Sequence, residues 1–463
     1  MVEASVNQLD TSLLDRLYQG CGSKAYPPEL MLKMVLFEYL EGRTSPSQWF
    51  RDAGEHDALK WLGRGIWPAR STWYQFRDRL DKVLQELNQS LVKQAVEENL
   101  IHPHQGAQDG STFRSQASRH QTFNRVRLEK RKATVAAAVD QDSQGQPLSQ
   151  PVPKWMPQTR SGRLELHGRI ELAEQKLSQM LQENAAKRKH HRRDEKNVVV
   201  SLTDPEAPFA RDKEKTFCFL YTAQMLVDAD SLMTLGYSVA NENTDVGTLG
   251  PMIDQVQKII GGTLKTISAD AGYSSVLDLQ DCLERGIDLL APVAENSFSQ
   301  PKQGTAKLFS REDFQWNPQE QTFLCPGGQQ LTYRTQERVA RHRGRTVICR
   351  HFQCLPKFCL ACPLAARCTK SPARGRRVKR LDGQEILDAQ KEKMKQPSAK
   401  ESFARRGQII ERAFADAKGH RGMNRLRGRG PRCARVSIGL LVLAQNTLTI
   451  YRLRNEKMLE KSG

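Results

Sequence analysis

The sequence predicts a mixed α/β protein with an all-helical N-terminal region. Between residues 197 and 293, stretches rich in β-branched and aromatic residues alternate with amphipathic stretches in the order βββαβαβ, which is typical of a mixed sheet with helices. Residues 1–100 show helical spacing of apolar residues instead. A chain of 463 residues is too long for one ordinary core. We therefore expect several structural units.

The first unit, residues 1–100, is expected to bind DNA or to support dimerisation. Pro27 and Pro28 open an apolar run, residues 30–40, that Gly42 closes, as in a capped helix. A further helix follows from the apolar spacing of residues 76–91. The unit contains four tryptophans, which we expect in its core: Trp49, Trp61, Trp67 and Trp73. No clear helix-turn-helix signature is present, so DNA binding and dimerisation both stay open.

The second unit, residues 101–300, contains the mixed sheet. We expect strands at 198–202, 216–226, 235–239, 264–269 and 287–293, and helices at 248–260 and 274–286. Asp270 directly follows one of these strands, and ligand sites in open α/β sheets lie at strand ends. Asp109 could end an earlier strand, although an Asp-Gly pair is also an ordinary turn.

Two segments interrupt this pattern before the C-terminal part of the core, residues 401–455. The first is a basic insertion, residues 113–196, with a proline-containing loop expected in its first half and an amphipathic helix over residues 164–181. The second is a basic, cysteine-rich insertion, residues 301–400. After it, Glu411 and Lys418 lie seven residues apart, on one face of a predicted helix. They could form a solvated ion pair, or a metal ligand beside a phosphate-binding lysine.

The charge of the chain indicates a polyanionic partner. The formal net charge is +19 and the pI is near 9.6, with basic clusters at residues 187–193, 374–380 and 421–435. Clustered lysines and arginines favour nucleic acid over general solubility, because each phosphate contact releases counterions. The polar N-terminus is no signal peptide, and no apolar run reaches the length of a membrane span. We therefore expect a cytoplasmic protein that does not enter the membrane.

Three acids are candidates for metal-assisted phosphoryl transfer: Asp109, Asp270 and Glu411. Such chemistry needs two or three carboxylates to hold two Mg²⁺ ions, and Mg²⁺ accepts ligands from distant points of a sequence. Spacing alone is a weak signal, because the chain has 52 acidic residues. The residues around the three acids carry more information.

The chain resembles the DDE-type transposases of bacterial insertion sequences, over nearly its whole length. Asp109-Gly110-Ser111-Thr112 is similar to their first-aspartate motif, and Asp270-Ala271-Gly272-Tyr273 to their second. The third motif of that family has a Tyr, an Arg, a Glu and, after six further residues, a Lys. Glu411 and Lys418 keep the last spacing. Phe403 stands where the Tyr is expected, and four residues rather than three separate Arg406 from Glu411.

The resemblance implies an RNase H-like catalytic fold and a Mg²⁺-dependent DNA transposase. Asp109, Asp270 and Glu411 would bind two Mg²⁺ ions, with Mn²⁺ as a substitute, and Lys418 would contact DNA phosphate. The arginines of the following basic loop suit further phosphate contacts: Arg421, Arg425, Arg427 and Arg429. The expected partners are transposon ends and target, both double-stranded DNA, with a homo-oligomer on DNA in the bacterial nucleoid. Two alternatives stay open: a metal-dependent nuclease without strand transfer, and an inactive transposase-derived DNA-binding protein.

Six of the ten cysteines lie between Cys325 and Cys368, which argues for metal rather than disulfides in the cytoplasm. Zinc takes four tetrahedral ligands, and a Cys-x-x-Cys pair supplies two from one turn. The set we select is Cys325, Cys359, Cys362 and Cys368, and its rivals are Cys354 and His351. The alternative is a cluster of reduced thiols in a metal-free subdomain.

Overall fold

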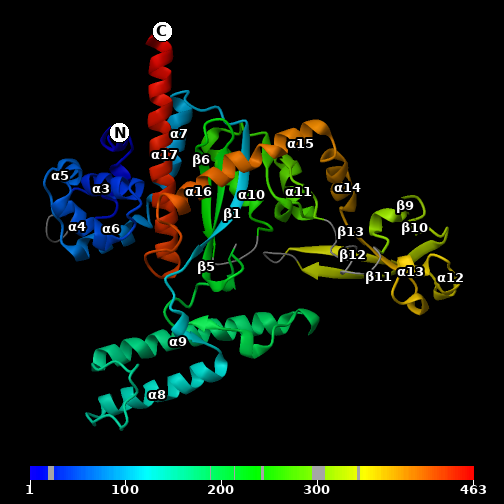
Figure 1. Ribbon diagram of the computed structural model, residues 1–463, viewed down its shortest axis with the longest axis horizontal. Helices are drawn as coiled ribbons and strands as arrows, with labels where there is room; N and C mark the ends of the chain where they lie inside the picture. The colour runs from blue at the N-terminus through cyan, green and yellow to red at the C-terminus, as the bar shows by residue number, and fades with distance from the viewer. Residues whose placement is uncertain are drawn as a thin grey trace. The chain divides into compact units, whose positions relative to one another are not determined.

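The computed structural model describes residues 1–18, 25–187, 189–212, 214–240, 245–294, 308–340 and 345–462 (Figure 1). Arg188, in the basic cluster 187–193, lies outside the described residues. The chain divides into two compact units. Unit 1 contains Met1–Thr244, Asp254–Leu264 and Gly407–Gly463, and unit 2 contains Asp245–Ile253 and Lys265–Arg406.

The N-terminal region of unit 1 is helical, as predicted. Its helices are α1 (Val2–Val6), α2 (Ser12–Asp15), α3 (Pro28–Leu40), α4 (Pro46–Glu55), α5 (Asp57–Leu62), α6 (Arg70–Leu80) and α7 (Leu84–Glu97). Pro28 occupies the first turn of α3, where its missing N–H costs no hydrogen bond. The apolar run that follows it is almost wholly buried.

The four tryptophans of this region divide into two pairs. Trp49 and Trp73 are buried and meet edge to face, with ring centroids 6.2 Å apart. Trp61 and Trp67 are 67% and 59% exposed, so the prediction that they fill the core is wrong. Trp67 stacks on Phe50 and donates its indole N–H to the Phe50 carbonyl, which covers only one face of the ring.

The sheet of unit 1 is antiparallel and is built around β5. Its strands are β1 (Gln105–Arg114), β4 (Phe209–Arg211), β5 (Phe217–Asp228) and β6 (Thr234–Ala240). β5 pairs with each of the other three strands and is buried along almost its whole length. Asp109 pairs with Met225, and the ladder continues to Arg114. Asp109 therefore lies within β1 and neither ends the strand nor forms a turn.

A helical hairpin stands between β1 and β5 in the sequence. Its helices, α8 (Arg125–Ser143) and α9 (Arg160–Ala186), lie side by side in Figure 1 and share their own core, in which Leu128 and Val135 join Ile170 and Leu177. At the base of the hairpin, β2 (Thr122–Phe123) pairs with β3 (Val200–Ser201). The helix predicted over residues 164–181 is confirmed. The loop predicted for the first half of the insertion is wrong over α8, because apolar residues there keep helical spacing and Asn124 caps the helix.

The C-terminal helix α17 (Gly430–Ser462) packs against α7, β6 and α3. Among the described residues one helix, Gly430–Glu460, is long and apolar enough to span a membrane by composition. Its most apolar window is 78% buried inside the protein, as in a core helix. Asn446 also exchanges hydrogen bonds of 2.8 and 2.9 Å with the backbone of Thr234, which fixes the helix against β6.

Unit 2 contains a parallel strand pair, β7 (Thr266–Ser268) and β8 (Asp288–Leu290), connected through α11 (Val276–Glu284). The later helices are α14 (Gln384–Lys393) and α15 (Pro397–Ala404). Gln390 donates from its amide to the carbonyls of Leu289 and Ala291, which fastens α14 to the end of β8. Helix α10 (Leu249–Ile260) confirms the helix predicted at 248–260 and ends directly before Gly261 and Gly262.

The cysteine-rich insertion folds as an antiparallel sheet within unit 2. Its elements are β9 (Gln315–Asn317), β10 (Thr322–Leu324), β11 (Gln330–Ala340), β12 (Thr346–Gln353), α12 (Pro356–Leu360), α13 (Ala365–Cys368) and β13 (Arg377–Leu381). Phe323 and Phe352 lie in the small core of this sheet. The chain is thus mixed α/β, with an antiparallel meander followed by parallel strands and late helices, in keeping with the predicted RNase H-like class.

Candidate functional site

The face of β1 that carries Asp109 is the face covered by helix α16 (Arg412–Gly419). Side chains alternate along a strand, so Asp109, Ser111 and Phe113 point to the same side. Lys418, at the end of α16, donates from Nζ to Ser111 Oγ at 2.8 Å and lies 5.2 Å from the Phe113 ring centroid. Phe414 completes the contact, with its ring centroid 6.4 Å from that of Phe113. The first and third motifs therefore meet on one side of the sheet.

Glu411 closes a π-helical turn, η9 (Gly407–Glu411), directly before α16. This turn packs against β1 and β5. Ile410, Phe414 and Ala417 are buried and fix the turn and α16 in the core. Glu411 is exposed, and Lys418 Nζ donates to Ser111 on β1. The choice between a surface ion pair and a metal ligand beside a phosphate-binding lysine stays a prediction.

The π-helical turn also explains the spacing of the third motif. A π-helical turn closes its hydrogen bond one residue later than an α-helical turn and so accommodates one extra residue. The turn begins directly after Arg406, which is where this chain has four residues instead of three before the glutamate. The guanidinium of Arg406 lies 5.8 Å from the ring centroid of Phe403, the residue at the tyrosine position.

In unit 2, Asp270 follows β7, so its predicted strand-end position is confirmed. Its Oδ1 accepts a 2.7 Å hydrogen bond from the Gly272 N–H and caps the short turn η4 (Ala271–Tyr273). Tyr273 is buried and donates its hydroxyl to Asp245 Oδ1 at 3.4 Å.

A second carboxylate reaches this turn. A methyl group on Gly272 would lie 2.9 Å from Asp270 Oδ1 and 3.3 Å from Asp245 Oδ2. Two carboxylates thus flank Gly272, and an added methyl group there would displace them. The sequence interpretation missed Asp245 and Ser111 as parts of the site. The alternation of β1 signals Ser111, whereas the position of Asp245 depends on a distant loop.

The four arginines of the basic loop have different environments. Arg421 is held inside the protein: its side chain is 14% exposed, Nε donates to Asp416 at 3.1 Å, and Nη1 donates to the Leu40 carbonyl. Arg425 donates to the carbonyls of Ser115 and Ala117 beyond the end of β1. Arg427 and Arg429 are exposed. The loop is thus anchored at its start, with its later arginines at the surface.

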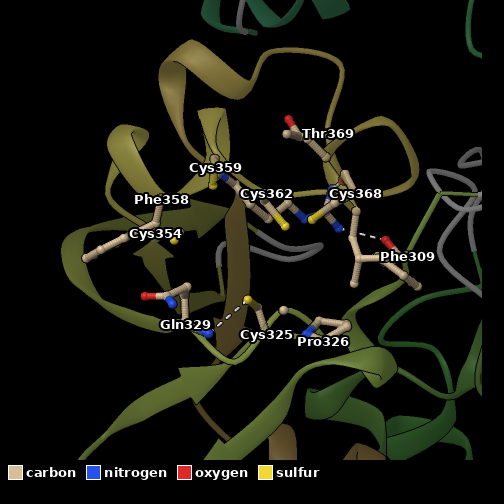
Figure 2. A pocket seen from close by; sticks show the side chains of 14 residues that line it. Phe309, Cys325, Pro326, Gln329, Cys354, Phe358, Cys359, Cys362, Cys368 and Thr369 are labelled. Atoms are coloured by element: carbon tan, nitrogen blue, oxygen red, sulfur yellow. Dashed lines mark hydrogen bonds between the residues drawn. The ribbon is translucent and has the colours of Figure 1, made fainter.

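Five thiols line one cavity of about 20 Å³ in the cysteine-rich insertion: Cys325, Cys354, Cys359, Cys362 and Cys368 (Figure 2). Burial raises the pKa of the Cys354 thiol to about 12 and also raises the pKa of Cys368. His351, one of the two alternative ligands, does not line this cavity. Its Nε2 is 3.2 Å from Glu337, and these two residues form with Cys349 the one described trio whose ligand atoms all lie within 4.8 Å.

Comparison with known families finds two transposase domains in the chain. Residues 324–451 match the family model described as "Transposase DDE domain", and residues 2–79 match "Transposase domain (DUF772)". No curated protein and no solved structure matches the chain. The mixed α/β fold is in keeping with these two matches, each of which covers less than half of the chain. The resemblance to the DDE-type transposases of insertion sequences, expected from the three motifs, is confirmed.

Proposed function

We propose that this protein is a DNA transposase that cuts the ends of an insertion sequence and joins their 3′-hydroxyls to target DNA. The observation that carries the proposal is the meeting of β1 and α16, which sets Lys418 on Ser111, two residues from Asp109. A phosphate-binding cation beside a carboxylate-bearing strand suits the handling of a phosphodiester. The transposase domain matches support the same class of substrate.

Asp109, Asp270 and Glu411 are the proposed carboxylates for two Mg²⁺ ions, with Mn²⁺ as a substitute. The donor set fits the metal, because Mg²⁺ prefers carboxylate oxygens and keeps several waters. Asp109 is partly exposed and Glu411 is exposed, so water and metal can reach both. When bound, the ions would supply charge stabilisation at the attacking and leaving oxygens.

The remaining residues position the DNA. Ser111 orients the Lys418 ammonium, which then holds a phosphate next to Asp109. Arg425, Arg427 and Arg429 contact further phosphates from the loop that follows. Arg421, in contrast, anchors that loop to α3. Because the π-helical turn absorbs the extra residue, Arg406 takes the place of the family arginine on the helix before Glu411.

The test is cleavage and joining of a DNA that carries the element's ends, with Mg²⁺ present. Asp109→Asn, Asp270→Asn and Glu411→Gln should each abolish both steps, because removing one unit of a metal site disables it, while DNA binding persists. Glu401→Gln is the matched control, since Glu401 is an exposed acid on the preceding helix α15. It should retain activity.

Other outcomes separate this proposal from its alternatives. Cleavage without joining would identify a nuclease, and binding without either reaction in the wild type would identify an inactive DNA-binding protein. Full activity in any of the three carboxylate variants would overturn the site.

Pairing two DNA ends also requires two active sites, so we expect a homo-oligomer on DNA, which light scattering of the complex would detect.

A further inference from the structure

The cysteine-rich insertion has too small a core for its length. Its buried cluster contains eight residues, three of them cysteines: Phe314, Phe323, Leu331, Phe352, Cys354, Cys359, Cys368 and Val378. A core of this size supplies little stability to a sheet of five strands, and natural subdomains of this kind are commonly cross-linked by a metal or by disulfides. None of the described cysteines forms a disulfide.

The thiols come from two separate segments that turn toward the same cavity. Cys325 begins the turn after β10, where its sulfur accepts a hydrogen bond from the Gln329 N–H at 3.3 Å. Cys359, Cys362 and Cys368 belong to the α12–α13 segment, and Cys359 Sγ accepts from the Arg376 N–H at 3.4 Å. Backbone N–H donors directed at sulfur favour thiolates over thiols.

The two segments lie close together at Gly327. A methyl group there would lie 3.2 Å from Cys362 Sγ and 3.7 Å from Cys325 Sγ. Figure 2 shows the cysteine side chains surrounding a single hollow. Its volume of about 20 Å³ has room for one water-sized particle or one metal ion.

A partly buried cation, Arg376, completes the surroundings. Arg376 lines the cavity and donates from its guanidinium to the carbonyls of Cys368 and Phe309 at 2.9 and 2.8 Å. Its Nε–H is buried without a hydrogen-bond acceptor in the described structure. A buried positive charge is costly unless a negative charge lies near it, and four thiolates around Zn²⁺ carry a net charge of −2.

We propose that Cys325, Cys359, Cys362 and Cys368 bind one structural Zn²⁺ ion. When the ion binds, the four thiols release their protons to solvent. The sulfurs move closer together around the ion, because tetrahedral Zn–S bonds of about 2.3 Å separate them by about 3.8 Å. The ion ties the turn after β10 to the α12–α13 segment. This proposal does not depend on the transposase chemistry.

The fifth thiol is not a ligand. Cys354 directly follows β12, is 2% exposed, and lies in the same small core as Phe352. Its thiol is a hydrogen-bond partner of the Cys359 sulfur. The trio Glu337, Cys349 and His351 is a polar cross-strand cluster instead. The Glu337 carboxylate lies 3.2 Å from His351 and 3.8 Å from Lys379. The positive charge of Lys379 would repel a metal ion bound there.

The experiment measures the metal content of the full chain, purified without added zinc, by mass spectrometry. We expect about one zinc per chain in the wild type and in Cys349→Ser and Cys354→Ser, and at least about a tenfold loss in Cys359→Ser and Cys362→Ser. Zinc lost in Cys349→Ser but retained in Cys359→Ser would overturn the proposal in favour of the trio. Zinc lost in Cys354→Ser would overturn the ligand set.

A measurement on the wild type avoids the risk that a variant fails to fold. Alkylation with and without a chelator, followed by peptide mass spectrometry, should show Cys325, Cys359, Cys362 and Cys368 protected by metal and labelled after its removal. Equal labelling of these four with and without the chelator, in folded protein, would overturn the proposal.

Discussion

Lys418 and Arg421 are neighbouring cations with opposite expected roles. Lys418→Ala should weaken DNA binding and reduce the slope of log K against log salt by about 0.9, the contribution of one phosphate contact. Arg421→Ala should leave the slope unchanged and destabilise the fold by about 1.5–3 kcal/mol, because the Leu40 carbonyl loses its charged donor. Salt titrations of binding, together with thermal unfolding, check both. An exchange of these two effects between the variants would contradict the structure.

Glu38 is a residue whose protonation should control stability. Burial, together with the nearby charge of Asp52, raises its pKa from 4.5 to about 8, and Arg43 opposes this only in part. Between these two pH values the folded chain holds a proton that the unfolded chain has released. Its contribution to stability is therefore present below pH 4.5, is lost as pH rises to about 8, and changes no further above that.

Glu38→Gln should remove this dependence. From pH 5 to pH 8 the free energy of unfolding of the variant should rise relative to that of the wild type, by about a few kcal/mol at most, as thermal unfolding at each pH would measure. Glu41→Gln, at an exposed position just after α3, is the control and should show a constant difference. A constant difference for Glu38→Gln as well would show that Glu38 is ionised in the folded protein.

At the scale of elements, the turn after β7 depends on the absence of a side chain at Gly272. Ala at this position would displace the carboxylates of Asp270 and Asp245, which lie 2.9 and 3.3 Å from the added methyl group. We expect Gly272→Ala to reduce DNA cleavage at least about tenfold with DNA binding unchanged, because misplaced ligands impair catalysis more than binding. Cleavage assays beside binding titrations measure this.

The control for Gly272 is Gly168, inside α9, where a methyl group meets nothing within 4 Å. Gly168→Ala should leave cleavage intact and stabilise the protein by about 0.5–1 kcal/mol. Wild-type cleavage in Gly272→Ala would show that the turn tolerates a side chain and would remove Asp245 from the site.

At the scale of the whole molecule, the α8–α9 hairpin should be removable. It has its own core, and its two ends meet at the β2–β3 pair, where Phe123 lies opposite Val200. Replacing residues 124–199 by Asn-Gly would turn this pair into a two-residue hairpin. The shortened chain should fold and should bind DNA with a smaller salt slope, since α8 begins with the basic sequence Arg-Val-Arg-Leu-Glu-Lys-Arg-Lys.

Circular dichroism and salt titrations of DNA binding test the shortened chain. An unchanged salt slope would show that the basic face of α8 does not contact DNA. Loss of folding would show that the hairpin core also supports β1 and β5.

The sequence by itself determined the features that depend on neighbours along the chain. Helical and strand periodicity is local, so helix α10 and the strands predicted at 216–226, 235–239, 264–269 and 287–293 were predicted correctly. The strand predicted at 198–202 is instead the two-residue β3, which pairs with β2 outside the main sheet. The three acidic motifs and the cysteine spacing are also local patterns, and they indicated the DDE transposase class that the family matches support.

Tertiary structure decided which distant residues share an environment. Lys418 contacts Ser111, and Arg421 is mostly buried. Trp61 and Trp67 are exposed, and His351 pairs with Glu337 outside the thiol cavity. The π-helical turn likewise accommodates the extra residue that precedes Glu411 in the third motif. The contacts of Lys418 and Arg421 join segments 307 and 381 residues apart, which no local pattern encodes.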